Sequence, residues 1–221
     1  MPISKAATSL ASDAAPRRRQ RGEPRRLLLE AAHDVFNRKG YATASTREIA
    51  TQAEVSETLI FRTFRNKAGL FREAMVRPFV DAIDREIELG RSRPPDVELT
   101  QEDTRAFVAA MYDVFRKHRA LAAMVFAADA LVESEVAESA VIDDVREAID
   151  RFVSHASEEA QAHGKAIDPA AHDLAIRGHM AMVAGVATFG SWYFGKRRPS
   201  RAAVIDEMSK WVWMRYNPPK G

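Results

Sequence analysis

The sequence predicts an all-α protein, with a small N-terminal domain of three helices followed by a larger helical domain. Three observations support this. Apolar residues recur every three to four positions through most of the chain, which is the helical period. No stretch alternates apolar and polar residues as a half-buried strand does, and no segment repeats. Glycine and two prolines fall together in residues 90–100, which are therefore expected to form a loop.

The composition is that of a soluble globular protein, and it excludes several classes. The 221 residues are 46% hydrophobic and 29% charged, and none is cysteine. Disulfides, thiol catalysis and cysteine metal sites are excluded, and a reducing, cytoplasmic location is expected. No apolar run approaches the roughly 20 residues that span a bilayer, so no membrane partner is expected. The arginines of residues 17–26 do not precede the apolar stretch of a signal peptide.

Residues 1–22 are rich in Ala, Ser, Pro and Arg and have no apolar period, which predicts a disordered basic arm. Its four clustered arginines fit either phosphate or minor-groove contact with DNA, or a tail that is only solvated: Arg17, Arg18, Arg19 and Arg21. Basic residues are also unevenly distributed along the whole chain. Residues 1–70 hold 13 Lys or Arg and 7 Asp or Glu, whereas residues 71–221 hold 20 and 24. This asymmetry predicts a polyanionic partner for the N-terminal end alone.

The first expected helix covers residues 24–39, and Gly40 follows directly after its end. One face of this helix is apolar: Leu28, Ala31, Ala32, Val35 and Phe36. A second helix is expected over residues 46–53. It begins with a capping box in which the Ser45 side chain accepts from the backbone and Glu48 reaches back to the cap. Its inward residues are Ile49, Ala50 and Ala53.

A three-residue break, Glu54 to Ser56, precedes a third expected helix over residues 57–64. Ser56 is predicted to cap it, and Ile60 and Phe64 lie four apart on its inner face. Two short helices joined by a short turn are the outline of a helix-turn-helix, whose second helix enters the DNA major groove. Asn66 is predicted to cap the next helix, which opens at Lys67.

That next helix is expected to extend towards Leu89, with Pro78 either kinking it or splitting it in two. Asp168 is predicted to cap a later helix that has Pro169 in its first turn. The remaining expected helices are residues 101–118, 120–131, 133–163, 169–194 and about 201–216.

Residues 25–75 resemble the DNA-binding domain of the TetR family of transcriptional regulators. The matching positions are Ala31, Ala32, Phe36, Gly40, Tyr41, Ile49, Ala50, Ala53, Val55, Ser56, Phe64, Lys67 and Leu70. The resemblance implies a DNA-binding domain over residues 23–70 and an effector-binding and dimerisation domain over residues 71–221. It further implies a homodimeric regulator, a repressor released from a palindromic operator in double-stranded DNA by a small hydrophobic effector. No cofactor is expected.

Carried over position by position, the resemblance assigns DNA contact to Ser45, Thr46, Arg47, Ser56, Glu57, Thr58, Leu59, Phe61, Arg62, Thr63 and Lys67. Arg62 is the best candidate for reading guanine, because a guanidinium can bond O6 and N7 together; the alternative is contact with phosphate alone. Leu59 is a candidate for thymine contact or for the core, and Thr46 for phosphate contact or for capping. Lys67 is expected to meet phosphate.

Three positions depart from the family pattern. Glu54 stands where the family usually has glycine, so the turn must form without it. Glu57 places a negative charge at the front of the reading helix, where it should face a base edge or water. Phe61 replaces a tyrosine and removes one hydroxyl contact to phosphate. The operator sequence and the binding strength therefore do not follow from the resemblance.

The resemblance also implies that the last two helices pair with their copies in a four-helix dimer interface, the alternative being core helices of a monomer. The expected interface residues are Gly178, Met182, Gly185, Phe189, Val204, Met208 and Trp211. The effector is expected among soft and aromatic residues of the middle helices, which otherwise form ordinary core. The candidate pocket residues are Phe107, Met111, Phe115, Met124, Phe126 and Phe152.

Two other functions compete with this interpretation. An enzyme is not expected, because the sequence has no nucleophile motif, no phosphate-binding glycine loop and no His-Glu-x-x-His. A metal site is not expected either, because the histidines at 155, 163, 172 and 179 do not define three or four converging ligands. The remaining alternative is a helical interaction protein whose basic end binds acidic protein or membrane surfaces without reading sequence.

Overall fold

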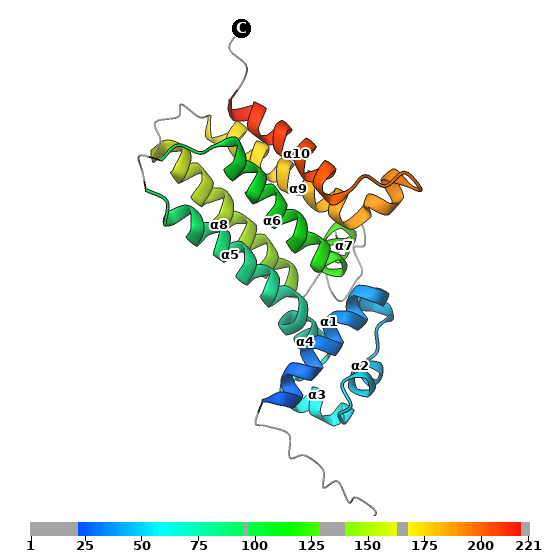
Figure 1. Ribbon diagram of the computed structural model, residues 1–221. Helices are drawn as coiled ribbons and strands as arrows, with labels where there is room; N and C mark the ends of the chain where they lie inside the picture. Colours follow the sequence, from blue (N-terminus) through cyan, green and yellow to red (C-terminus); the bar gives the residue numbers. More distant parts are fainter. Residues whose placement is uncertain (1–21, 95–96, 129–139, 163–167, 218–221) are drawn as a thin grey trace, which may run out of the picture.

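The computed structural model describes residues 22–94, 97–128, 140–162 and 168–217. Every regular element within these ranges is a helix, which confirms the all-α prediction. Figure 1 shows a small group of helices at the N-terminal end and, beyond it, a larger bundle of long helices. The predicted arm lies outside the described residues, apart from Gly22 at the start of the first helix.

The small group comprises α1 (Glu23–Thr43), α2 (Thr46–Gln52), α3 (Glu57–Phe64) and α4 (Lys67–Phe71). Each residue that the sequence places on an inner face of α1, α2 or α3 is buried, because the amphipathic period assigned them to one shared core. Phe36 is at its centre, with its ring centroid 4.9 Å from that of Phe71 and 6.0 Å from that of Tyr41. Gly40 interrupts α1 with a φ of 79°, a conformation that glycine adopts freely.

The predicted caps were right at two positions and incomplete at two. The Ser45 side chain accepts from the Glu48 N–H at 3.1 Å, and Asn66 accepts from the Gly69 N–H at 2.8 Å. The reciprocal half of the capping box was wrong, because the Glu48 carboxylate pairs with Arg38 and Lys39 instead. Ser56 occupies the cap position of α3, but its side chain makes no capping hydrogen bond.

Pro78 neither splits nor ends the helix that starts at Lys67. The helical path continues through a π-helical turn, η1 (Arg72–Val76), into α5 (Arg77–Arg91). In this wider turn the Arg77 N–H bonds to the carbonyl of Arg72, five residues back. Proline cannot donate the usual hydrogen bond four residues back and its ring crowds that carbonyl, so a wide turn directly before it accommodates both effects. The path from α4 to α5 therefore connects the small group of helices to the bundle without a loop.

The larger bundle adds α6 (Gln101–Lys117), α7 (Arg119–Ala128), α8 (Ala140–Ala162), α9 (Pro169–Phe194) and α10 (Arg201–Tyr216). Asp168 caps α9 as predicted, accepting from the Ala170 N–H at 3.1 Å. Residues 129–139, where two expected helices meet, lie outside the described ranges. Within those ranges, no helix has the length and apolar character to cross a bilayer.

Candidate DNA-binding surface and effector pocket

The outer face of α3 presents a compact set of exposed side chains. Thr58, Arg62 and Thr63 are exposed, and the ring of Phe61 is 48% exposed to solvent. Ile60 and Phe64 point inward and are buried, so they fix the helix against the core. Leu59 is only partly exposed and packs against that core. The exposed face therefore consists of two hydroxyls, one guanidinium and one aromatic ring on a firmly packed helix.

Glu57 does not face only solvent, because the hydroxyl of Thr46 donates to its Oε1 atom at 2.6 Å. Both side chains are partly buried, and the bond joins the beginning of α2 to the beginning of α3. It gives the carboxylate a donor at the place where it would otherwise face incoming phosphate. Thr46 thus holds the two helices of the motif together.

The cations around α3 fall into two groups. Arg47, Arg62 and Arg65 are exposed and have no ion-pair partner among the described residues. Arg38 and Lys39, in contrast, bind the Glu48 carboxylate at 3.0 and 2.8 Å, and the hydrogen bond from Lys39 is the main reason that the pKa of Glu48 is lowered. Exposed guanidiniums without an internal partner are available to phosphates or bases.

Lys67 has internal contacts of its own. Its Nζ atom donates to the Ala42 carbonyl at 3.2 Å and lies 4.6 Å from the centroid of the Tyr41 ring. These contacts hold the ammonium beside the start of α4. Ser45 and Ser56 are exposed at the N-cap positions directly before α2 and α3.

Glu54 provides the turn between α2 and α3 by adopting a positive φ of 54°. This is the left-handed conformation that glycine adopts without cost and other residues adopt at a cost of roughly 1–2 kcal/mol. The sequence predicted that the turn must form without glycine, and the backbone of Glu54 shows how it does so.

The end of α1 is joined to the corner between α6 and α7. The Asn37 side chain donates to the Lys117 carbonyl at 2.8 Å and accepts from the Ala120 N–H at 3.2 Å. His118, at that corner, is buried against His33 of α1, with ring centroids 5.3 Å apart. Burial, and then the neighbouring His33 and Lys117, lower the pKa of His118 to about 4.

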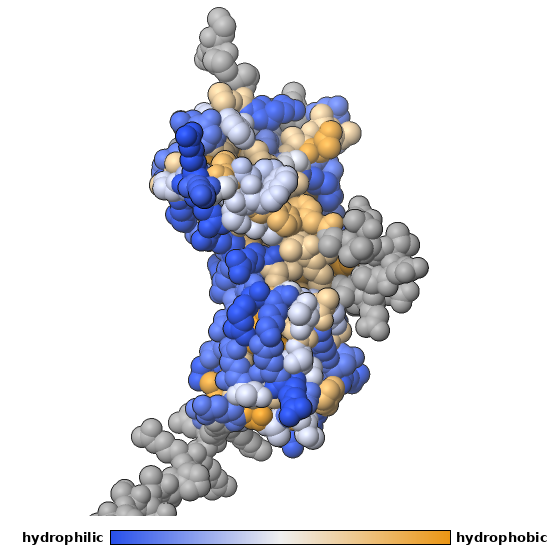
Figure 2. Space-filling model, turned by 90° about the vertical axis from the view of Figure 1, so that its right-hand side faces the viewer, coloured by the Kyte–Doolittle hydropathy of each residue, from blue (hydrophilic) through white to orange (hydrophobic). Residues whose placement is uncertain are grey.

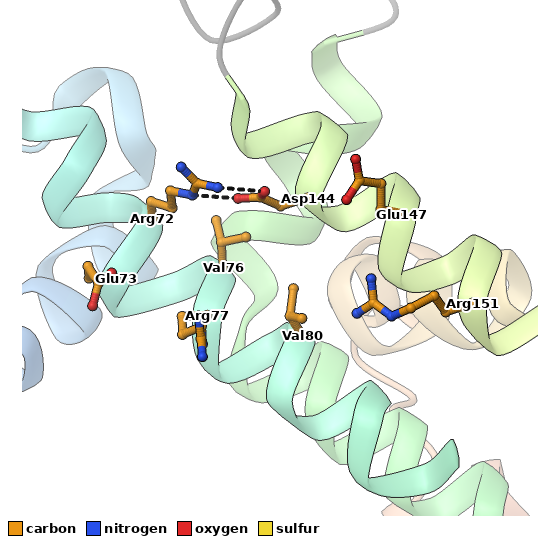
Figure 3. Close-up of a pocket in the computed structure, with 8 residues that line it drawn as sticks. All are labelled: Arg72, Glu73, Val76, Arg77, Val80, Asp144, Glu147 and Arg151. Atoms are coloured by element: carbon orange, nitrogen blue, oxygen red, sulfur yellow. Dashed lines mark hydrogen bonds and ion pairs between the residues drawn. The ribbon is translucent and has the colours of Figure 1, made fainter. Parts of the chain in front are cut away.

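A second connection runs along the side of the molecule, in a small groove of about 210 Å³ between η1, α5 and α8. Figure 3 shows Arg72 of η1 bonded to Asp144 of α8 across this groove. Glu73, the next residue, binds Arg25 of α1 at 2.6 Å. Charged side chains dominate the groove, and its ion pairs connect the small domain through η1 to the bundle.

A cavity with a volume of about 920 Å³ lies between the helices of the bundle. Its wall comes from α5, α6, α8, α9 and α10 and from the loop before α6. Apolar and aromatic residues make up much of it, including Phe107 and Phe152, whose rings stack at 5.2 Å. Polar groups are present as well, among them His155, His172 and Tyr216. A cavity of this size and lining suits a small organic ligand.

An N-terminal helix-turn-helix followed by a helical bundle is also found in known proteins. Residues 28–74 match the model of the bacterial regulatory proteins of the tetR family. These residues therefore form an N-terminal domain of the TetR-family type. The resemblance predicted from residues 25–75 is therefore confirmed.

Two relatives from Bacillus subtilis (strain 168) match part of this chain. The uncharacterized HTH-type transcriptional regulator YvkB is 51% identical over 43 residues, which are 20% of this chain and 23% of YvkB. The probable HTH-type transcriptional regulator YttP is 31% identical over 99 residues, 45% of this chain and 47% of YttP. The chain thus matches less than half the length of either relative.

Solved structures show that the similarity in fold extends over most of the chain. A TetR-like transcriptional regulator from Rhodococcus sp. RHA1 superposes with a TM-score of 0.62 at 20% identity, covering 91% of this chain and all of that one. The regulator FadR from Bacillus subtilis, solved in complex with stearoyl-CoA, gives 0.59 at 16% identity over 85% of this chain and 97% of that one. At these identities the likeness concerns the fold.

The six side chains predicted to form the pocket lie in three different environments in the structure: the cavity wall, the core and the surface. Phe107 and Phe152 line the cavity. Met111 and Phe115 are buried in the core beside it, while Met124 is partly buried against that core. Phe126 is 44% exposed, and its ring lies 5.9 Å from that of Phe189. The helical period gave their inward direction but not which of the inward side chains border empty space.

The residues predicted for the dimer interface fall into a buried group and a group that is exposed or partly exposed. Val204 and Met208 are buried within the chain's own core. Gly178, Phe189 and Trp211 are exposed on α9 and α10, and Met182 and Gly185 are partly exposed. Further large apolar side chains of these helices are exposed that the sequence reading did not select: Leu174, Trp192, Tyr193, Phe194 and Met214. Figure 2 shows apolar surface on the larger domain, whereas the small domain is mostly hydrophilic.

Sequence reasoning missed several residues of the candidate sites. Arg65 follows α3 and has a φ of 70°; its position one residue beyond the reading helix would have identified it. Glu86, Trp213 and Tyr216 line the cavity but were not among the predicted pocket residues, and the last two come from a helix that was assigned to the dimer interface. Nothing in their local pattern distinguishes them from ordinary surface residues. Among the described residues, no group of His, Asp or Glu side chains is arranged to hold a metal ion.

Proposed function

We propose that the chain is a sequence-specific DNA-binding transcriptional regulator, a repressor that binds a palindromic operator as a homodimer and is released by a small ligand. The observation that carries this proposal is the exposed face of α3, with Arg62 and its neighbours on a helix-turn-helix that matches the family. Three exposed guanidiniums, those of Arg47, Arg62 and Arg65, belong to this motif and have no ion-pair partner among the described residues. They supply the charge that sequence-independent attraction to phosphates requires.

Dimerisation is supported by the exposed apolar residues of α9. Leu174, Gly178, Ala181, Gly185 and Trp192 follow one another at intervals of three, four or seven residues, so they share one face of the helix. Such a patch is costly to leave in water and is typical of an interface. Two-fold pairing along it would place two copies of α3 on two half-sites. Release by a ligand would then follow from a cavity whose occupied state favours another spacing of the two small domains.

The proposal is tested by selecting bound sequences from a random DNA pool with the purified full-length chain. A two-fold symmetric consensus is expected, bound at least ~10³-fold more tightly than random DNA. Affinity should fall by roughly 10³-fold or more between 50 and 200 mM salt if about eight phosphates are contacted. A chain that prefers no DNA sequence at any salt concentration would instead be an interaction protein with a basic end.

Single variants then separate base reading from phosphate contact. Arg62→Ala should cost about 1–3 kcal/mol on the selected site and relax discrimination at one base position. Arg77→Ala is the matched control, because Arg77 is exposed on α5 and paired with Asp81, away from α3. An equal loss on every DNA sequence for Arg62→Ala would assign Arg62 to phosphate instead.

A further inference from the structure

Glu86 is the unusual residue of the bundle cavity. It lies on α5 in the cavity wall and is partly buried. Burial raises the pKa of its carboxyl group, and the opposing effect of Arg85 is smaller. The carboxyl has no hydrogen-bond or ion-pair partner among the described residues. A carboxylate withdrawn from water without a partner is unfavourable, so such a group commonly marks a site where a ligand supplies the partner.

The other charges of the wall have the same sign or are already neutralised. Three more carboxyl groups line the cavity, those of Glu98, Asp103 and Glu159. Its one described guanidinium, that of Arg93, binds Glu159 at 2.6 Å. Asp103 accepts from the backbone and hydroxyl of Thr100, and these bonds lower its pKa and keep it ionised. The described part of the wall therefore has a negative potential, and it holds no unpaired Lys or Arg side chain that would offset this potential.

The uncharged part of the wall suits a flat or branched apolar body. The stacked rings of Phe107 and Phe152 border the cavity, together with Ile176, Val212 and Trp213. Aromatic faces attract cations as well as apolar groups. Burial lowers the pKa of His179, which keeps that ring neutral at pH 7, and burial raises the pKa of Tyr216, which keeps the phenol neutral. Neither residue adds a positive charge.

We propose that the effector is an amphipathic organic cation, held by Glu86 through its charged nitrogen and by the aromatic wall through its apolar body. This inference rests on the proposed function, in which the cavity holds the effector. It also distinguishes the chain from the FadR structure of similar fold, whose ligand is stearoyl-CoA. The phosphates of such a ligand would be repelled by the carboxyl groups of this cavity.

A matched pair of ions tests the charge preference on the full-length chain. Tetraphenylphosphonium and tetraphenylborate have nearly the same size and shape and opposite charge. By isothermal titration calorimetry, the wild-type chain should bind the cation at least about tenfold more tightly than the anion, a difference of about 1.4 kcal/mol. Equal affinities, tighter binding of the anion, or binding of neither ion would overturn the inference.

Two variants locate the effect. Glu86→Gln should weaken binding of the cation about tenfold and bring the affinities of the two ions closer together. Glu88→Gln removes the same charge two residues along α5, at an exposed position outside the cavity wall, and should change the affinity less than twofold. Equal effects of the two variants would show a general charge effect and sink the assignment of Glu86. Far-UV circular dichroism checks that both variants fold.

Failure of this inference and failure of the proposed function give different results. DNA selection is performed without any ligand. A specific operator combined with no preference for the cation would therefore overturn only the inference that the effector is a cation. A clear preference for the cation combined with no sequence-specific DNA binding would overturn the proposed function as a regulator and leave the assignment of the cavity to a cationic ligand intact.

Discussion

The exposed face of α3 and the bundle cavity both carry charges that have no partner among the described residues, but these charges differ in sign and in solvation. Arg47, Arg62 and Arg65 are exposed, so water solvates their charges at little cost. Glu86 is partly buried, so its charged form has lost part of that solvation and burial raises the pKa of its carboxyl group. The exposed site could therefore be predicted from the charges in the sequence, whereas the cavity site could be identified only once the structure showed which charge is buried.

The two regions should also differ in how much one aromatic side chain contributes to the stability of the fold. Phe36→Ala removes the fully buried centre of the small domain and is expected to cost about 3–5 kcal/mol. Phe107→Ala, at the partly buried cavity wall, should cost roughly half of that or less, because less contact area is lost.

The positions of the tryptophans allow the two regions to be observed separately. Trp192, Trp211 and Trp213 all lie in α9 and α10. In Phe36→Ala, part of the helical signal in circular dichroism should therefore melt at lower urea than the tryptophan fluorescence. Coincident transitions in that variant would mean that the two domains unfold as one unit.

The same contrast explains which parts of the structure the sequence predicted. The bounds of α3 and α9 were predicted to the residue, because the apolar face of α3 and the Asp168 cap and Pro169 of α9 are local signals. The wide turn before Pro78 was missed, since the sequence shows the proline but not how the backbone adapts to it. The wall of the cavity was mostly missed too, because it joins side chains from five helices that are distant in sequence. Ser56 shows a third limit, because a residue type that favours the cap position makes no capping hydrogen bond there.

His118 lies at the joint between the two regions and should make the stability of the chain depend on pH. Its pKa is lowered from 6.5 to about 4 on folding, so the unfolded chain binds the proton more tightly. Stability is therefore complete above pH 6.5 and is lost as the pH falls from 6.5 towards 4. Between pH 7 and pH 5 the loss should be about 2 kcal/mol, measured by urea denaturation at each pH.

His118→Gln should lower the stability at pH 7, because the buried ring is lost, but it should lose less stability on acidification than the wild type does. An unchanged difference between pH 7 and pH 5 in this variant would place the acid sensitivity elsewhere, for example at His179, whose pKa is also lowered by burial.

The two serine caps provide a smaller and sharper comparison within the DNA-binding motif. Ser45→Ala removes a capping hydrogen bond of 3.1 Å and should cost about 1 kcal/mol. Ser56→Ala removes no capping bond and should change the stability by no more than a few tenths of a kcal/mol. Thermal melts of the two variants measure this difference directly. Equal losses would mean that the Ser56 hydroxyl has a role in solution that its position in the fold does not reveal.

The smallest expected effect is a gain in stability, at the turn between the two helices of the motif. Glu54 holds a positive φ of 54°, which costs a non-glycine residue roughly 1–2 kcal/mol. Glu54→Gly removes that cost but adds chain entropy to the unfolded state, so a net gain of about 0.5 kcal/mol is expected. Ser56→Gly, two residues along at a φ of −74°, has no such cost to relieve and should not stabilise the chain. If both glycine variants lose stability alike, Glu54 is held in place by contacts that outweigh its backbone conformation.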